Sequence, residues 1–189
     1  MINTIPNYLT LFRIAMVPLI TVAYLLGVSG LWVALIFLLT SVTDYLDGLL
    51  ARRLNQVSRL GAFLDPVADK LMVVVVLVLL LSDREVLEYA ISSKLFTIVS
   101  AIIIGREIAI SGLREWMAEI GSRTQVAVSG LGKFKTSAQM AAITLLLYKE
   151  DFGAIPVFRI GEFMLYIAAG LTLWSMVTYL RAAWPELEK

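Results

Sequence analysis

The sequence predicts an all-α membrane protein, in which six transmembrane helices follow a short amphipathic helix at the membrane interface. The composition is 59% hydrophobic and only 16% charged, and the mean hydropathy is +0.84, which is too apolar for a soluble domain. Six apolar stretches each approach the roughly 20 residues that a helix needs to cross the hydrocarbon core. The 189 residues suit a single compact domain, residues 1–189.

The order of the elements follows from these apolar stretches. Residues 1–12 carry apolar side chains at helical spacing with polar ones between them, which is typical of an interfacial helix: Ile2, Ile5, Leu9 and Phe12. The six spans are expected at residues 11–26, 31–53, 60–81, 95–116, 131–148 and 157–184. The polar residues 82–94 are expected to form a loop. The first and fifth spans are marginal in length for crossing a membrane.

Lys and Arg are distributed unevenly between the two sides of this predicted bundle. With six spans, both ends of the chain face the same side, which carries Arg13, Arg52, Arg53, Arg59, Arg114, Arg123, Lys133, Lys135, Arg181 and Lys189. The other side carries only Arg84, Lys94, Lys149 and Arg159. The positive-inside rule places the richer side in the cytoplasm.

Four aspartates interrupt the second and third predicted spans: Asp44, Asp47, Asp65 and Asp69. A carboxylate inside a spanning helix is costly, so such a residue indicates a functional site. The first two are three residues apart and the last two are four apart, so each pair shares a helix face. The basic residues 52–59 between the pairs suit a surface turn, and short connections make consecutive helices antiparallel neighbours. The pairs are therefore expected to face each other at matched depth.

Four clustered carboxylates need positive charge nearby, because their mutual repulsion otherwise raises their pKa values. The chain has no His and no Cys, the residues that usually bind zinc and copper. Carboxylate oxygens suit hard cations such as Mg²⁺, Mn²⁺ or Ca²⁺, and two such ions form the clamp used for displacement at phosphorus. The alternative is a set of buried ion pairs with Arg52, Lys70 or Arg106.

The aspartates and their neighbours form a known motif. They read D-x-x-D-G-x-x-A-R, eight further residues, and G-x-x-x-D-x-x-x-D, with fixed positions at Asp44, Asp47, Gly48, Ala51, Arg52, Gly61, Asp65 and Asp69. This pattern resembles that of the CDP-alcohol phosphotransferases, and every fixed position is present. The similarity extends over essentially the whole chain. It includes a P-N-x-L-T-x-x-R opening at residues 6–13, like that of bacterial members that form phosphatidylglycerophosphate.

The resemblance implies a role for each residue of the motif. Asp44, Asp47 and Asp65 would bind two divalent ions, Mg²⁺ or Mn²⁺. Asp69 would be the catalytic base, at a position that also allows it to bind an ion. The residues that contact the CDP group would be Asn7, Thr10, Gly48, Ala51, Arg52 and Gly61. For Gly48, close packing between helices is the alternative explanation.

A second polar cluster occupies residues 105–115 and 132–139. Arg106 lies in an apolar context and is expected to face the bundle interior, and Arg114 lies two turns further along on nearly the same face. If these two cations and Lys133 and Lys135 converge on the aspartates, they would bind an acceptor phosphate. For Lys133, contact with anionic lipid headgroups is an equally good explanation.

The function implied by the resemblance is transfer of the phosphatidyl group from CDP-diacylglycerol to sn-glycerol 3-phosphate, with release of CMP. The resemblance also implies a homodimer among the lipids of the bacterial cytoplasmic (inner) membrane, with its active site facing the cytoplasm. No nucleic-acid partner is expected. Sibling enzymes that use inositol phosphate, serine or phosphatidylglycerol share the aspartate motif, and only the basic cluster favours a phosphorylated acceptor. A divalent-cation transporter is the alternative from another class, and it would not need a CDP-lipid.

Overall fold

The structure, a computed structural model, describes residues 5–54, 59–120 and 130–187. Within these ranges the chain is helical, and β-type pairing is confined to one isolated bridge between Phe152 and Ile155. The helices are α1 (Ile5–Leu25), α2 (Gly30–Leu54), α3 (Arg59–Ser82), α4 (Arg84–Tyr89), α5 (Ser93–Glu119), α6 (Gly130–Tyr148) and α7 (Val157–Leu187). The predicted all-α class is therefore confirmed.

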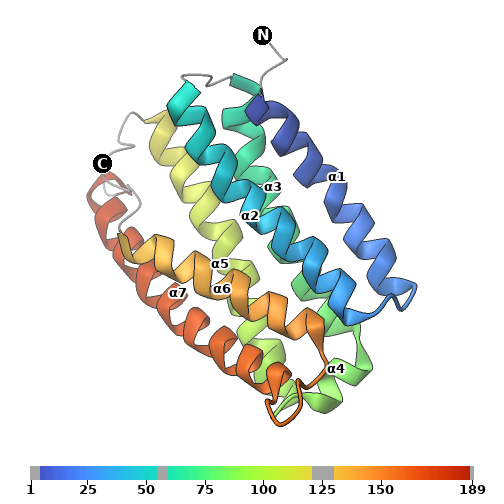
Figure 1. The fold of residues 1–189 in the computed structure, drawn as a ribbon. Coiled ribbons are helices and arrows are strands. Elements are labelled where there is room, and N and C mark those ends of the chain that lie inside the picture. The colour runs from blue at the N-terminus through green and yellow to red at the C-terminus, as the bar shows by residue number, and fades with distance from the viewer. Residues whose placement is uncertain (1–4, 55–58, 121–129, 188–189) are drawn as a thin grey trace.

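The six long helices pack as a closed ring. In this ring α1 contacts α2, α2 contacts α6, α6 contacts α7, α7 contacts α5, α5 contacts α3, and α3 returns to α1. The long helices alternate in direction, so the two ends of the chain lie at the same end of the bundle, and the short helix α4 lies at the other end (Figure 1). Helix α1 therefore contacts both of the helices that carry the aspartates, and α2 and α3 run antiparallel to each other.

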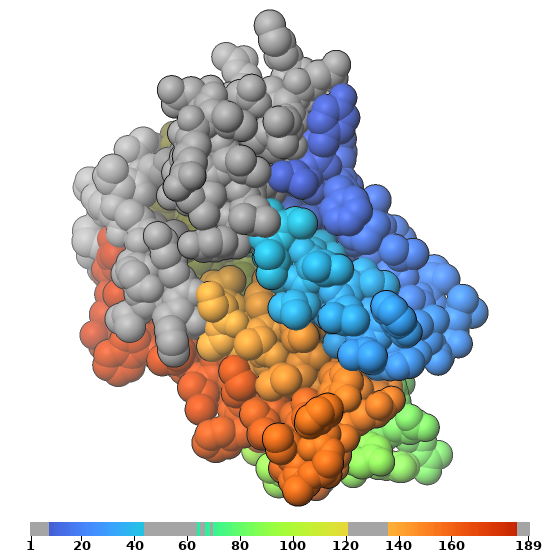
Figure 2. All heavy atoms as spheres, viewed as in Figure 1, coloured from blue at the N-terminus to red at the C-terminus, as the bar shows by residue number. Residues whose placement is uncertain are grey.

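The core of the bundle is apolar and includes residues from every one of these helices. Its fully buried members include Ile20, Phe37, Leu77, Phe96, Leu146 and Leu165. The outer surface is apolar as well: Leu26 is 76% exposed and Trp174 is 74% exposed. In the space-filling view the side chains of α1, α2, α6 and α7 form one continuous face (Figure 2). A surface with this many large apolar side chains is suited to lipid rather than to water.

Three helices are long and apolar enough to cross a membrane, with candidate spans at Tyr8–Leu25, Ser93–Glu119 and Val157–Trp184. Shorter apolar segments, Gly30–Thr43, Lys70–Ser82 and Thr136–Tyr148, lie in the other three long helices. The chain is therefore a membrane protein. The helices that correspond to the last five predicted spans begin and end within three residues of the expected positions.

The beginning of the chain differs from the prediction. A separate interfacial helix over residues 1–12 was expected before a span starting at residue 11, but Ile5–Leu25 is one uninterrupted helix. Its polar residues Thr10 and Arg13 are only 1% and 2% exposed, whereas Tyr8 and Phe12 are exposed. The polar side chains thus face the bundle and the apolar ones face outward. An amphipathic pattern therefore does not distinguish an interfacial helix from a spanning helix with a polar inner face.

The expected loop over residues 82–94 was also wrong, because it contains the short helix α4. Asp83 caps this helix: its carboxylate accepts hydrogen bonds from the backbone N–H of Glu85 at 2.9 Å and of Val86 at 3.5 Å. Val86 is 1% exposed and anchors the helix to the core. One capping residue and one apolar contact are a weak sequence signal, which is why the segment resembled a loop.

Asp83 also links three parts of the chain at this end of the bundle. Its Oδ2 atom accepts a hydrogen bond from Tyr24 Oη on α1 at 2.6 Å and pairs with Lys149 Nζ just after α6. The Lys149 ammonium lies 4.6 Å from the centre of the Tyr24 ring. Partial burial raises the pKa of Asp83, but the hydrogen bonds from Lys149 and Tyr24 and the Lys149 charge outweigh it, so this pKa lies below its usual value.

We predict that Asp83→Ala lowers the free energy of unfolding by about 1–3 kcal/mol, because it removes a helix cap and a charge-assisted hydrogen bond. Because the pKa of Asp83 is depressed in the folded state, this contribution is complete above the unfolded value of about 3.9 and disappears as the pH falls below it. Thermal unfolding in detergent, followed at neutral and acidic pH, measures both effects.

The matched control is Glu88→Ala, which removes the exposed Arg84–Glu88 pair. An exposed pair contributes little, so this variant should stay within about 0.5 kcal/mol of the wild type. An Asp83→Ala variant as stable as the wild type at neutral pH would contradict the role given to this carboxylate.

Candidate active site

The four aspartates lie in the parts of α2 and α3 that the 55–58 segment connects. Asp44 and Asp69 are each about 15 Å along the axis from the connected helix ends, at 1.5 Å per residue. On the same scale Asp47 and Asp65 are about 10 Å from those ends. The helix register therefore places the two pairs at matched levels on antiparallel helices that both contact α1.

Most of the side chains predicted for the site lie outside the described part of the structure. This holds for the four aspartates and for Asn7, Ala51, Arg52, Lys133 and Lys135, and also for the surroundings of Gly48 and Gly61. Their backbones belong to α1, α2, α3 and α6. Their roles remain predictions.

Helix α1 adds two described polar residues to the interior. Thr10, which was predicted to contact the nucleotide, is buried, and so is Arg13 one turn further along. Because α1 packs against both aspartate helices, Arg13 brings a positive charge into the bundle next to them. Arg13 was part of the sequence motif but had no role in the predicted site. An arginine within an apolar stretch was the signal that could have indicated one.

Arg106 faces the interior as predicted, but it already has protein partners. Its Nη1 atom donates to Glu107 Oε1 at 2.8 Å, and its Nη2 atom donates to Ser175 Oγ on α7 at 3.2 Å. Its side chain is 9% exposed, and its buried Nε atom has no hydrogen-bond partner among the described residues. The guanidinium is therefore fixed between α5 and α7 by two of its five N–H donors.

Arg114 lies two turns further along α5 and is held in a similar way. Its Nη2 atom donates to Tyr179 Oη on α7 at 3.0 Å, and its guanidinium carbon lies 5.1 Å from the centre of the Tyr179 ring. Its Nε atom is also buried and lacks a partner in the described part of the chain. The structure thus brings Arg106 and Arg114 to the same α5–α7 interface.

The donor chemistry fits a hard divalent cation. Among the residues whose side chains the structure describes, no group of three or more His, Cys, Asp or Glu could hold a metal ion. The aspartates on α2 and α3 are outside that set, and they remain the candidate ligands. They supply only oxygen atoms, in a chain without His or Cys, which suits Mg²⁺ or Mn²⁺ better than zinc or copper.

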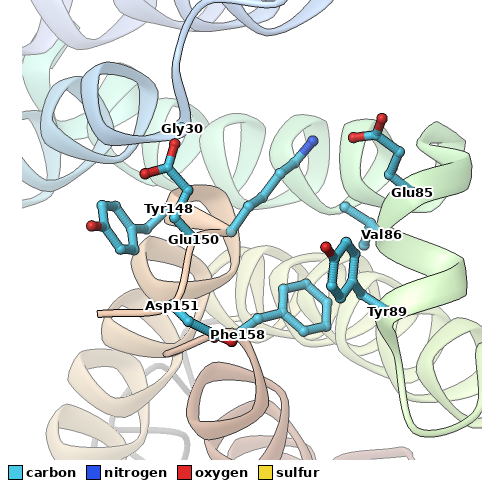
Figure 3. Close-up of a pocket in the computed structure, with 9 residues that line it drawn as sticks. Gly30, Glu85, Val86, Tyr89, Tyr148, Glu150, Asp151 and Phe158 are labelled. Carbon is cyan, nitrogen blue, oxygen red and sulfur yellow. The ribbon is translucent and has the colours of Figure 1, made fainter. Parts of the chain in front are cut away.

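A cavity of about 290 Å³ lies at the opposite end of the bundle, between α4 and the start of α7. Figure 3 shows the acidic side chains of Glu85, Glu150 and Asp151 around it, together with the rings of Tyr89 and Phe158, whose centres are 6.1 Å apart. Its lysine, Lys149, is already paired with Asp83. An acidic cavity repels phosphates, so it is not a candidate for a phosphorylated substrate.

Comparison with known proteins agrees with the motif. The family model described as CDP-alcohol phosphatidyltransferase matches residues 3–174. Three similar relatives are CDP-diacylglycerol–glycerol-3-phosphate 3-phosphatidyltransferases. Those of Sodalis glossinidius and Pectobacterium atrosepticum are each 52% identical over 185 residues. That of Yersinia enterocolitica is 47% identical over 186 residues. Each match covers 97% of this chain and 96% of the relative.

The match to the family model covers most of the chain, including both aspartate helices. Enzymes of this family generally depend on a divalent metal, which agrees with the donor set. The chain therefore belongs to the CDP-alcohol phosphatidyltransferase family.

Proposed function

We propose that this chain transfers the phosphatidyl group from CDP-diacylglycerol to sn-glycerol 3-phosphate, forming phosphatidylglycerophosphate and CMP. The observation that carries the proposal is the complete aspartate motif, whose two halves lie at matched levels on α2 and α3. Similarity to relatives named for this reaction, over 97% of the chain, supports the choice of donor and acceptor.

The chemistry is a displacement at phosphorus. Asp69 accepts the proton of the primary hydroxyl of glycerol 3-phosphate, and that oxygen attacks the phosphorus on the lipid side of the diphosphate. The bond between this phosphorus and the bridging oxygen breaks, and CMP leaves. Two Mg²⁺ or Mn²⁺ ions would be held by the carboxylates of Asp44, Asp47 and Asp65, and Asp69 is close enough in sequence to contribute as well. When bound, these ions neutralise charge on the diphosphate and on the leaving group.

The remaining residues of the motif bind and orient the donor. Gly48, Ala51 and Gly61 have small side chains, which lets a nucleotide approach the helix backbones closely. Asn7, Thr10 and Arg52 supply polar contacts to the CDP group. The burial of Thr10 on a helix that contacts both α2 and α3 supports its place in this set.

The acceptor phosphate is bound by a basic group made of Arg106, Arg114, Lys133 and Lys135. Support comes from the two arginines, which are fixed by α7 and each keep a buried Nε–H that has no partner among the described residues. Fixed guanidinium donors recognise phosphate well. The partner Glu107 offsets part of the Arg106 charge when the site is empty, which lowers the cost of burying that charge.

The membrane arrangement is also part of the proposal. Residues 1–189 form one domain with six spans, made by α1, α2, α3, α5, α6 and α7, in the bacterial cytoplasmic membrane. The Lys and Arg distribution supports a cytoplasmic active site and cytoplasmic termini. The protein acts as a homodimer.

The arrangement predicts that a reporter fused to the C-terminus is active only in the cytoplasm, because an even number of spans returns the chain to its starting side. A reporter after Ser92, between α4 and α5, should be active only outside. A C-terminal reporter that is active outside would show that one of the three shorter apolar helices does not span the membrane.

The function itself is tested with purified protein, CDP-diacylglycerol and a panel of acceptors. Transfer to sn-glycerol 3-phosphate should release CMP, and inositol phosphate, serine and phosphatidylglycerol should be poor acceptors. EDTA should abolish transfer, and Mg²⁺ or Mn²⁺ should restore it, because the carboxylates alone cannot neutralise the leaving group. A better acceptor elsewhere in the panel would reassign the enzyme within its family. Full activity in EDTA would exclude the two-ion chemistry.

A further inference from the structure

The inward face of α6 carries one buried polar residue among apolar neighbours. Ala142, Ile143, Leu146 and Leu147 recur at helical spacing and are fully buried in the core. One turn before them on the same face is Gln139, which is 3% exposed. A long amide in a buried apolar stripe of a membrane helix is costly unless its polar atoms have partners.

The carbonyl oxygen of the Gln139 side chain lacks such a partner among the residues that the structure describes. This atom, Oε1, is buried and receives no hydrogen bond from any described residue. Buried carbonyl oxygens without a donor are rare in native proteins, and each requires an explanation. A carbonyl oxygen can only accept, so the group that completes this site must be a donor.

The position of Gln139 places it near the level of the aspartates along the bundle. Ser41 Oγ on α2 lies 3.7 Å from the Sδ atom of Met140, the residue that follows Gln139. Ser41 in turn precedes Asp44 by one helical turn. The side chains of α2 and α6 meet along this part of the bundle (Figure 2). Gln139 is therefore within about one turn of the level of Asp44.

The proposed reaction supplies a suitable donor at this place. The acceptor phosphate has no proton to give when fully ionised, and the primary hydroxyl of the acceptor gives its proton to Asp69. On the acceptor, the hydroxyl on the central carbon of glycerol 3-phosphate is then the donor that remains. Lys135, which belongs to the proposed phosphate group, precedes Gln139 by four residues and therefore occupies the same helix face.

We infer that Gln139 determines acceptor specificity by accepting a hydrogen bond from the central hydroxyl of glycerol 3-phosphate. This inference rests on the proposed function and adds a residue to it. A buried acceptor of this kind rejects an analogue without the hydroxyl, because the carbonyl then stays unpartnered in the closed site.

The test compares two acceptors on the full-length protein in vesicles, with CDP-diacylglycerol and Mg²⁺. One is sn-glycerol 3-phosphate, and the other is 3-hydroxypropyl phosphate, which keeps the phosphate and the primary hydroxyl but lacks the central one. The wild type should prefer glycerol 3-phosphate by about 10–100-fold in kcat/KM, the usual effect of one buried hydrogen bond. This comparison needs no variant.

Gln139→Leu should remove that preference. Its kcat/KM for glycerol 3-phosphate should fall by about 10–100-fold, while its kcat/KM for 3-hydroxypropyl phosphate should stay within about twofold of the wild type. Its KM for CDP-diacylglycerol should not change. Leucine removes a buried carbonyl oxygen that has no donor among the described residues, so without substrate the variant should unfold no earlier than the wild type.

The matched control on the same helix is Thr144→Val. The Thr144 hydroxyl donates to the backbone carbonyl of Met140 at 2.9 Å, so its removal should leave the acceptor preference at the wild-type value. The inference is overturned if the wild type uses both acceptors equally, or if Gln139→Leu loses the same factor with both. It is also overturned if the KM for CDP-diacylglycerol rises instead, which would assign Gln139 to the nucleotide. A wild type that transfers to neither acceptor contradicts the proposed function, and the inference falls with it.

Discussion

The packing of this protein depends on keeping charged and hydrogen-bonding groups inside a bundle whose outer surface is apolar. Thr10, Arg13 and Arg106 are buried, while Tyr8, Phe12 and Trp174 are exposed. A charged side chain that faces lipid is not solvated by water, which costs free energy. The helix face that carries polar residues therefore turns toward the interior of the bundle. The same constraint explains why the interior contains residues that can bind a polar substrate. In a water-soluble protein of this composition, the apolar faces would be buried instead.

The two ends of the bundle use buried polar groups differently. At the α4 end they connect helices: Asp83 joins Tyr24 and Lys149, and the fully buried Glu162 accepts hydrogen bonds from the Ile91 backbone N–H at 3.0 Å and from Tyr166 Oη at 2.5 Å. From the middle of the bundle toward the aspartate end, several buried polar atoms have no partner in the described part of the chain, including Arg106 Nε, Arg114 Nε and Gln139 Oε1. Satisfied networks rigidify a structure, whereas unsatisfied groups indicate where a ligand belongs. The first end therefore holds the helices in place, and the donors and acceptors left over in the rest of the bundle are the groups that the proposed substrates would use.

Long apolar runs made most of the fold predictable, and the weak local signals account for the errors. Helix α6 was expected at 131–148 and is found at Gly130–Tyr148, because composition and length suffice for such a segment. Helix α4 was missed because it depends on one cap at Asp83, and the start of α1 was misassigned because periodicity does not identify the buried face. The matched levels of the four aspartates along α2 and α3 followed from sequence alone. The partners of Arg106 and Arg114 did not, since Ser175 and Tyr179 lie more than 60 residues away and meet them only because α5 and α7 pack together.

We propose that the four aspartates form one site in which Asp65 binds metal and Asp69 accepts the proton. The most direct test compares Asp65→Asn with Asp69→Asn by titrating Mn²⁺ with electron paramagnetic resonance, measuring CDP-diacylglycerol binding by calorimetry, and measuring turnover. We expect Asp65→Asn to lose Mn²⁺ affinity. We expect Asp69→Asn to bind Mn²⁺ and CDP-diacylglycerol but to lose at least about 10²-fold in turnover, the usual contribution of a general base. Two results would contradict these roles: wild-type turnover in Asp69→Asn, or a loss of Mn²⁺ affinity in Asp69→Asn as complete as that in Asp65→Asn.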